Sequence, residues 1–351
     1  MKRLTGLRVF VTGGGAVGSA TAWRLQAEGA RVILCDPAPL ADNASGVAAG
    51  MLAPAFEAAL DPASRGHFPI LKAARDLWPD LAEATAPFGG RLDRSGALWI
   101  GDDASQADML AALQGVGARA DRTSAAEAEG ASPGLRAPTG AVHTSEDWRL
   151  EPRAMLGALR EAFVAAGGEV RPVGLREFPS DADVWVLATG LEPAGLTGRV
   201  AELACLSPIK GQIARFPGTG PFAGPALRAP GVYLAPSADG AAAGATMEAG
   251  LADRTIMPAA LEQLRDLAAR MVPALAGARL SGEAGVRAAT PDGLPLVGPS
   301  ADPRMMLALG ARRNGWLLAP LMAQIVADRL AGADAGPWAG ALDARRFTPP
   351  G

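Results

Sequence analysis

The chain has few of the side chains that most often act as acids, bases or metal ligands. Its 351 residues include two histidines, two cysteines and one tyrosine. His67 and His143 stand in unrelated contexts, so a His-based triad or a multi-His metal site lacks the side chains to form. Cys35 and Cys205 fit neither a zinc site nor a disulfide framework. We therefore expect no metal and a cytoplasmic location.

Long apolar runs and an excess of charge of one sign are also absent. No stretch reaches the roughly 18 uncharged apolar residues that a membrane span needs. Lys and Arg number 33 against 36 Asp and Glu, and this net charge of -3 gives no electrostatic reason to expect nucleic acid or an anionic membrane as partner. With 49% hydrophobic residues, the composition predicts a soluble globular protein with a small ligand. We interpret the N-terminus as mature, because the glycines at 13–15 interrupt its apolar run.

The first 36 residues have the pattern of a nucleotide-binding βαβ unit. A strand is predicted at 8–11, GGGAVG follows at 13–18, a helical pattern runs over 16–28, and a second strand at 31–35 ends at Asp36. In this G-x-G-x-x-G fingerprint, Gly13 permits the turn, Gly15 lets backbone approach a pyrophosphate, and Gly18 lets helix and strand pack closely. Asp36 is placed to accept hydrogen bonds from a ribose diol and to repel a 2′-phosphate. The unit predicts NAD or FAD rather than NADP, and does not separate the first two.

The rest of the chain alternates between α/β and antiparallel β patterns. We predict helices at 68–86, 151–166 and 316–330, strands at 91–101, 169–173, 181–188, 205–216, 231–236 and 305–309, a loop at 44–54, a Pro/Gly-rich connection at 217–230, and a fraying end at 332–351. Such alternation predicts one nucleotide-binding domain that a sheet-rich domain interrupts twice.

The predicted fold class is therefore α/β, with two domains. A Rossmann-like domain is assigned to 1–85, 150–205 and 285–351. An α+β substrate-binding domain, with a mostly antiparallel sheet, is assigned to 86–149 and 206–284.

Two arginines near the C-terminal end stand among small and apolar residues. Arg287 lies in GVRAATPDGLP, and Arg313 lies in GARRNGW, just before the apolar helix predicted at 316–330. A guanidinium in such surroundings is costly unless it meets an anion. From the residues alone, an internal ion pair with Asp or Glu and a bound anionic ligand both remain open.

Together these motifs resemble the glycine oxidase and D-amino-acid oxidase family of FAD-dependent amine oxidoreductases, over nearly the whole chain. The resemblance is carried by GGGAVG with Asp36, ASGVAAGMLAP at 44–54, SPIKGQ at 207–212, YLAPSADGAAAGATMEAG at 233–250, GVRAATPDGLPLVG at 285–298 and GARRNGWLLAP at 310–320. It implies FAD rather than NAD. Related sarcosine oxidases attach flavin through a cysteine near the C-terminus, where neither Cys35 nor Cys205 lies, so we expect noncovalent FAD.

The resemblance also assigns residues to the two ligands. For the cofactor it implies Gly13, Gly15, Ala16, Val17, Gly18, Asp36, Pro37, Ala44, Ser45, Ala49, Gly50, Met51, Val173, Gly190, Asn314, Gly315, Trp316 and Leu317, with Val173 near the adenine. For the substrate it implies that Arg287 grips the carboxylate in a bidentate fork. Arg313 and Tyr233 would lie beside the same group, and Met247 in the pocket wall.

The implied activity is oxidative deamination of glycine, sarcosine or small D-amino acids. Hydride would pass from the substrate Cα to flavin N5, the imine would hydrolyse to an α-keto acid and ammonia, and oxygen would be reduced to hydrogen peroxide. No side chain is needed as acid or base, because alignment supplies most of the catalysis. A role in thiamine biosynthesis and a homo-oligomeric state are compatible with the resemblance.

Three alternatives stay open for the activity. One is a dehydrogenase of the same fold that uses a non-oxygen acceptor. The others are an NAD-dependent dehydrogenase and a flavin-binding subunit without turnover.

Three positions depart from the family pattern and bear on substrate choice. Arg312 follows Ala311 where an aromatic or histidine pair is usual, and Ser237 replaces a common basic residue. Arg312 either faces solvent or admits a second acidic group. Phe56 stands where small residues are common, and either narrows the pocket or lines it for an apolar side chain.

Overall fold

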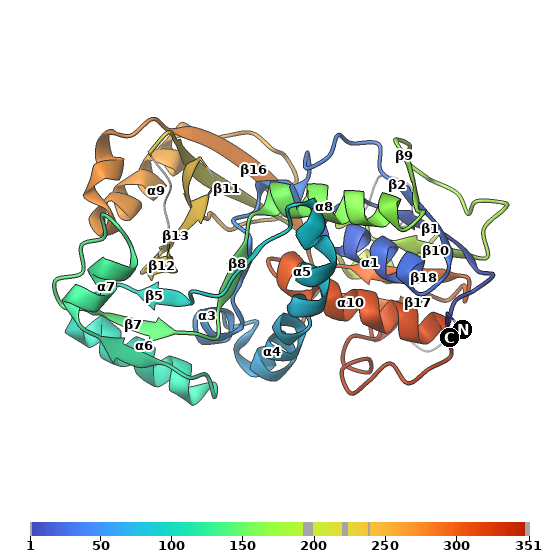
Figure 1. Ribbon diagram of the computed structural model, residues 1–351, viewed down its shortest axis with the longest axis horizontal. Helices are drawn as coiled ribbons and strands as arrows, with labels where there is room; N and C mark the ends of the chain where they lie inside the picture. The colour runs from blue at the N-terminus through green and yellow to red at the C-terminus, as the bar shows by residue number, and fades with distance from the viewer. Residues whose placement is uncertain (1, 192–198, 220–223, 238, 348–351) are drawn as a thin grey trace.

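Two large β-sheets, each covered by helices, form the two halves of the molecule, at right and left in Figure 1. The computed structural model describes residues 2–191, 199–219, 224–237 and 239–347. The first sheet has six strands in the order β17-β18-β10-β1-β2-β9. Their bounds are β1 (Arg8–Thr12), β2 (Arg31–Cys35), β9 (Glu169–Arg171), β10 (Val184–Leu187), β17 (Leu296–Pro299) and β18 (Met305–Leu309). All neighbours are parallel except β17 and β18.

Both faces of this sheet are buried, which explains why its strands are continuous apolar runs. Val9 and Val11 point to one face, where they join a core with helices α1 (Ala16–Ala27), α8 (Pro152–Ala165) and α10 (Gly315–Leu330). Phe10, one residue out of phase, points to the other face and packs with Trp185.

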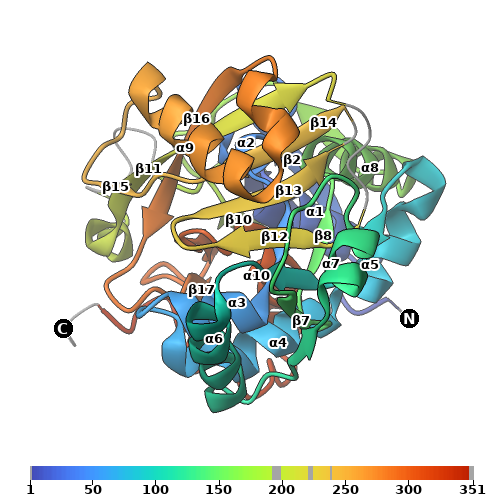
Figure 2. The same cartoon turned by 90° about the vertical axis from the view of Figure 1, so that its left-hand side faces the viewer.

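The second sheet has nine strands and is antiparallel except between β5 and β12. Its strands are β5 (Ala97–Trp99), β6 (Asp121–Thr123), β7 (Ala141–Thr144), β11 (Ser207–Pro217), β12 (Ala226–Ala229), β13 (Val232–Ser237), β14 (Gly240–Gly244), β15 (Glu248–Ala249) and β16 (Ser281–Ala289). Helix α9 (Pro258–Met271) covers one face (Figure 2) through Leu261 and Leu264. Helix α6 (Asp103–Gly115) packs on β7 through Leu113.

A small sheet and several short helices lie between the halves. Strands β3 (Met51–Leu52), β8 (Trp148–Leu150) and β4 (Leu92–Asp93) form the sheet, and the helices are α2 (Ala44–Val47), α3 (Pro54–Leu60), α4 (Phe68–Asp76) and α5 (Trp78–Thr85). Helix α7 (Ala125–Ala131) lies instead beside α6 at the far left of Figure 1, where Ala128 joins the core of the nine-stranded sheet. The mostly parallel sheet and the mostly antiparallel sheet, each with helices packed on it, confirm the predicted α/β fold class. The domain bounds stay a proposal, and β16 spans the proposed bound at 285.

Several predicted segments were wrong in detail. The helix predicted at 68–86 is two helices, because Pro79 has no N–H to continue the hydrogen bonds of α4. The strand predicted at 91–101 divides into β4 and β5, which belong to different sheets. The connection predicted at 217–230 contains β12, and its residues 220–223 lie outside the described residues.

The segment at 44–54 was predicted as a loop, but it contains α2 and β3. Helix α2 begins after Asn43, whose side chain accepts a 3.0 Å hydrogen bond from the Gly46 N–H. A four-residue helix leaves no apolar repeat to detect, so the cap was the available signal.

The end predicted to fray is packed against the six-stranded sheet as far as it is described. Leu342 is fully buried, and its carbonyl accepts a 2.8 Å hydrogen bond from Val297 N–H. Arg346 donates to both carboxylate oxygens of Asp292, at 2.9 and 2.8 Å. The Gly, Ala and Pro content hid these few anchoring residues, while 348–351 lie outside the described residues.

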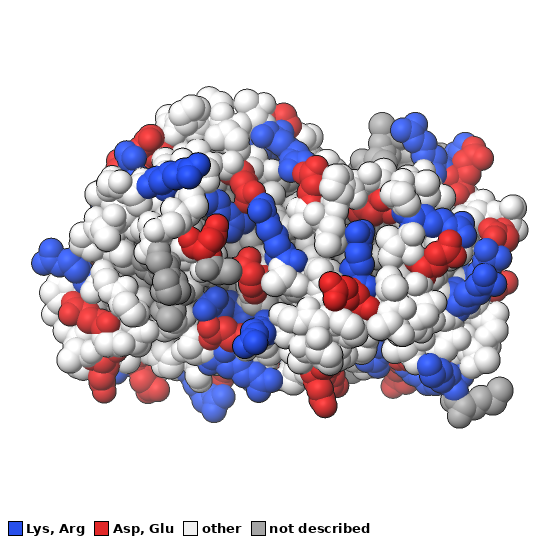
Figure 3. All heavy atoms as spheres, turned by 45° about the horizontal axis from the view of Figure 1, so that its top comes forward, with Lys and Arg blue, Asp and Glu red and all other residues white. Residues whose placement is uncertain are grey.

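Charges of both signs are mixed over the surface drawn in Figure 3. Among the described residues, none of the helices is both long and apolar enough to cross a membrane. The cytoplasmic location and the homo-oligomeric state stay predictions.

Candidate active site

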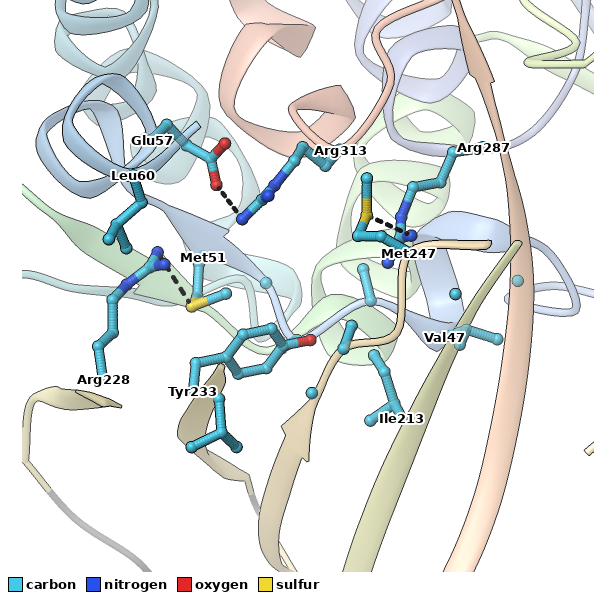
Figure 4. Close-up of a pocket in the computed structure, with 18 of the residues that line it drawn as sticks. Val47, Met51, Glu57, Leu60, Ile213, Arg228, Tyr233, Met247, Arg287 and Arg313 are labelled. Atoms are coloured by element: carbon cyan, nitrogen blue, oxygen red, sulfur yellow. Dashed lines mark hydrogen bonds and ion pairs between the residues drawn. The ribbon is translucent and has the colours of Figure 1, made fainter. Parts of the chain in front are cut away.

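A cavity of about 350 Å³ lies where the segment from α2 to α3 and the start of α10 face the nine-stranded sheet (Figure 4). Three arginines line it, namely Arg228 from β12, Arg287 from β16 and Arg313 from the turn before α10. Glu57 is the one carboxylate on its lining among the described residues. The cavity wall is therefore electropositive.

Arg287 has no carboxylate partner among the described residues. Its Nη1 donates to the Thr246 carbonyl at 3.3 Å and to the Met247 sulfur at 3.2 Å. A Cβ on Gly211, from the neighbouring strand β11, would lie 2.2 Å from Nη1, so glycine there makes room for the guanidinium. Burial lowers the pKa of Arg287. Of the two alternatives left open for Arg287, the described residues supply no internal ion pair, and the geometry favours an anionic ligand.

Tyr233 lies beside this arginine, with its ring extending across the cavity and its hydroxyl toward Arg287 (Figure 4). Its strand β13 pairs with β14, and Gly244 opposite it leaves space for the phenol. Burial raises the pKa of Tyr233, although the nearby arginines oppose that effect. The phenol therefore remains a hydrogen-bond donor near neutral pH.

Arg313, in contrast, has an internal ion pair. Its Nη2 lies 3.0 Å from Oε1 of Glu57, which is only 4% exposed on α3. The charge of Glu57 raises the pKa of Arg313. The second oxygen of Glu57, Oε2, is buried without a hydrogen-bond partner. The sequence analysis missed Glu57 because nothing in APAFEAAL marks one glutamate as buried.

The structure corrects the expectations for Arg312 and Phe56. Arg312 is turned inward: it forms an ion pair with the buried Asp61 at the end of α3, and it lines the cavity that the glycine fingerprint also lines. Its charge is therefore already balanced within the protein. Phe56 is fully buried behind the cavity wall and stacks on Trp99 with 6.2 Å between ring centroids. One turn of α3 carries Glu57 toward the cavity and Phe56 toward the core.

Arg228 was also missed, because it lies in the segment predicted to be a connection. It is 3% exposed, its Nη2 donates to the Met51 sulfur at 3.5 Å, and its guanidinium carbon lies 5.1 Å from the centre of the Phe56 ring. Asp147 lies nearby and accepts hydrogen bonds from the first N–H groups of α3, Ala55 at 2.8 Å and Phe56 at 3.2 Å. Burial raises the pKa of Asp147 to about 6.

A second cavity, of about 300 Å³, adjoins the first and shares Ala44, Gly285 and Arg287 with it. The glycine fingerprint lines it. Gly13 has a φ of +106°, and its added Cβ would lie 2.3 Å from the Ala188 carbonyl oxygen. At the start of α1, the Ala16 N–H donates to the Ser45 hydroxyl at 3.0 Å. A helix N-terminus, small residues and the carboxylate of Asp36 around one cavity fit a dinucleotide.

Most of the predicted ligand residues line these two cavities. The second cavity is lined by Gly13, Gly15, Ala16, Val17, Asp36, Ala44, Ser45, Gly190, Arg287 and Gly315. The first is lined by Ala44, Ala49, Gly50, Met51, Tyr233, Met247, Arg287, Arg313 and Trp316. Five predicted cofactor residues line neither cavity: Gly18, Pro37, Val173, Asn314 and Leu317. The roles of all these residues stay predictions.

A hydrogen bond between Trp316 and Ser45 connects two parts of the cavity wall. Trp316 Nε1 donates to the Ser45 carbonyl at 3.0 Å, which joins the start of α10 to α2.

Cys35 is buried in β2, where burial raises its pKa to about 11. No cluster of His, Cys, Asp or Glu that suits a metal ion occurs in residues 2–191, 199–219, 224–237 and 239–347.

Comparison with known proteins identifies the family. The DAO model of FAD dependent oxidoreductases matches residues 8–329. The glycine oxidase of Pseudomonas putida is 29% identical, over 93% of this chain and 95% of its own. A putative thiamine biosynthesis oxidoreductase, ThiO of Rhizobium etli, is 31% identical over 92% of this chain and 96% of its own.

A solved structure shows the same relationship in three dimensions. The glycine oxidase of Geobacillus kaustophilus has a TM-score of 0.82 at 25% identity, over 97% of this chain and 99% of its own. The resemblance seen in the sequence is confirmed, and so are the predictions of FAD and of an oxidoreductase. The chain belongs to the DAO family of FAD-dependent oxidoreductases.

Proposed function

We propose that the protein oxidises glycine, sarcosine or small D-amino acids at the bond between Cα and nitrogen, with Arg287 holding the substrate carboxylate. The observation that carries the proposal is the guanidinium of Arg287, which lines both cavities and has no carboxylate partner among the described residues. A planar guanidinium binds a carboxylate through two parallel charge-assisted hydrogen bonds, which orient it as well as attract it. The names of the relatives from Pseudomonas and Geobacillus support the same substrate class.

The residues of the glycine fingerprint and of segment 44–51 would hold FAD. Apart from the Ala16 N–H, which donates to Ser45, the first N–H groups of α1 are available to a pyrophosphate, and Asp36 offers a carboxylate to a ribose diol. Bound FAD supplies the oxidising chemistry by accepting two electrons and a proton equivalent as hydride.

The remaining side chains would position the substrate. Tyr233 would donate its hydroxyl hydrogen to the same carboxylate as Arg287. Arg313 is held by Glu57, and the unpartnered Oε2 of Glu57 offers an acceptor to the substrate amine. Binding at both ends of a small molecule fixes its Cα, and such alignment contributes much of the rate in reactions that need no acid or base.

The oxidised substrate is an imine, which water hydrolyses to an α-keto acid and a free amine. We infer that oxygen is the electron acceptor and that hydrogen peroxide is the second product. A place in thiamine biosynthesis is supported by the name of the Rhizobium relative.

The test is the visible spectrum of the purified protein without oxygen, before and after addition of glycine, sarcosine and D-alanine in turn. We expect an oxidised-flavin spectrum that one of them bleaches and that air restores. In Arg287→Met, the flavin should stay bound while the apparent second-order rate constant of bleaching falls about 100-fold, as for loss of one partner of a buried charged pair. The control is Arg122→Met, which replaces an exposed arginine on β6 that lines neither cavity.

Three results would count against parts of this proposal. A flavin that none of the three amino acids bleaches would contradict the substrate class. Normal bleaching kinetics in Arg287→Met would remove the carboxylate assignment. A bleached flavin that air fails to restore would indicate a dehydrogenase with another acceptor.

A further inference from the structure

Three cations in the described part of the chain are at most 3% exposed: Arg75, Lys210 and Arg228. Two of them have a carboxylate partner. Arg75 lies 3.0 Å from Glu146, and Lys210 lies 2.7 Å from Asp253. Arg228 has no carboxylate within ion-pair distance among the described residues. A buried cation without a counter-charge is costly, so Arg228 needs a separate explanation.

Arg228 makes two weak contacts, and neither supplies a negative charge to balance its own. The Met51 sulfur accepts one weak hydrogen bond at 3.5 Å, and the Phe56 ring offers its face at 5.1 Å. The Nε atom is buried without a partner. Because Arg228 lines the cavity, its remaining donors are available to a ligand.

The two carboxylates nearest in electrostatic effect are engaged elsewhere. Asp147 accepts hydrogen bonds from the backbone at the start of α3. Glu57 is paired with Arg313 at 3.0 Å. Neither is within ion-pair distance of Arg228, so both stabilise its positive charge only from a greater distance.

The balance of charge on the cavity lining leads to the same result. Arg228, Arg287 and Arg313 line it together with one described carboxylate, Glu57. The pair of Arg313 and Glu57 is neutral, and the carboxylate of a simple amino acid would balance Arg287. The charge of Arg228 then has no partner on the cavity lining, and the carboxylate that acts on it most strongly, Asp147, lies beyond ion-pair distance.

We propose that Arg228 binds a second acidic group of the substrate, so that the preferred substrates are amino acids with a side-chain carboxylate. The inference rests on the proposed function, because it assigns the first carboxylate to Arg287. Arg228 and Arg287 come from different strands and lie on opposite sides of the Tyr233 ring in Figure 4, so one carboxylate does not serve both. The role first considered for Arg312 thus belongs to Arg228.

The wild-type protein provides the first test. Anaerobic flavin reduction is measured with D-aspartate and D-glutamate and with their amides, D-asparagine and D-glutamine, which have nearly the same shape. We expect the better acid to exceed its own amide by about 100-fold in reduction rate at low concentration, as for a buried charged hydrogen-bonded pair. Amides that reduce the flavin as fast as the acids would overturn the inference.

A binding measurement gives a readout that is independent of turnover. Succinate, which has no amine to oxidise, is titrated into the oxidised protein alongside butyrate, and the shift of the flavin absorbance is followed. We expect succinate to bind at least about tenfold more tightly than butyrate, because only succinate has a second carboxylate. Equal affinities would contradict the inference.

The variant Arg228→Met then tests whether Arg228 is the cause of the preference for a second carboxylate. The ratio of acid to amide rates and the ratio of succinate to butyrate affinities should both fall to about one. Arg122→Met, which removes an exposed arginine, should keep both ratios. A preference for acids that survives in Arg228→Met would overturn the assignment. If Arg228→Met does not fold, the wild-type comparison of acids with amides still decides.

The failures of the two proposals are distinguishable. Reduction by glycine or D-alanine without preference for acids overturns the role of Arg228 and leaves the proposed function intact. A flavin that no amino acid reduces, acidic ones included, removes both.

Discussion

Four arginines lie near the two cavities, and the presence or absence of a neighbouring carboxylate distinguishes their roles. Arg313 pairs with Glu57 and Arg312 with Asp61, whereas Arg287 and Arg228 have no such partner among the described residues. Sequence context could not separate them, because the partners come from α3. Arg312 and Asp61, for example, are 251 positions apart.

Tyr233 provides a prediction at the scale of one residue. Burial raises the pKa of this phenol, so in the folded protein tyrosinate absorbance should rise at a pH above the ordinary pKa of about 10. The unfolded chain ionises first, so this group should lower the folding stability as the pH rises past about 10.

Ultraviolet difference spectroscopy measures this titration without background from another phenol, because Tyr233 is the only tyrosine. The chain unfolded in guanidinium is the reference, and Tyr233→Phe is the control without signal. A folded protein that titrates together with the unfolded chain would contradict the buried position.

At the scale of elements, strong local patterns were predicted well and weak ones were missed. Strands β1, β2, β10 and β18 and helices α1, α8 and α10 follow the predicted positions. Helix α9 was missed although Leu261, Leu264, Ala268 and Met271 show a helical apolar repeat. Helix α6 has little such repeat, because small alanines surround its few large buried residues.

The start of α1 supports a prediction about cofactor retention. A side chain at Gly15 would lie over the helix N-terminus, with its Cβ 3.0 Å from the Ser45 hydroxyl. In Gly15→Val we therefore expect FAD to be lost on dialysis while the far-ultraviolet circular dichroism stays native.

Gly157→Ala is the matched control for this substitution. Gly157 lies inside α8, where an added Cβ meets nothing within 4 Å. We expect it to keep FAD and to gain up to about 1 kcal/mol in stability. Retention of FAD by Gly15→Val would place the cofactor away from the start of α1.

At the scale of the whole molecule, residues near both ends of the chain build one site. The segment from α2 to α3 and the start of α10 meet strands β11 to β16 around the cavity, and the Trp316 to Ser45 hydrogen bond joins the first two. The described C-terminal segment closes the edge of the six-stranded sheet.

The packed C-terminal segment carries a stability prediction. Leu342 is fully buried, so Leu342→Ala should lower the free energy of unfolding by about 2 to 5 kcal/mol, through lost burial and a cavity. Chemical denaturation followed by tryptophan fluorescence measures it. Val164→Ala removes a side chain that is 51% exposed and should change stability by less than about 0.5 kcal/mol. If Leu342→Ala changed the free energy of unfolding as little as Val164→Ala, the packing of the C-terminal segment around Leu342 would be contradicted.

Local sequence was enough to predict the βαβ unit, the apolar α10, the fold class and the family. Turn glycines, apolar periods and a carboxylate at the end of a strand act over short stretches and leave their marks in the order of residues. The pairing of Arg313 and Arg312, the space that Gly211 leaves for Arg287, and the isolation of Arg228 needed the folded chain. Coulomb and steric forces act over a few ångströms between residues that the sequence separates by hundreds of positions, so only tertiary packing determines which charges are balanced and which remain for a ligand.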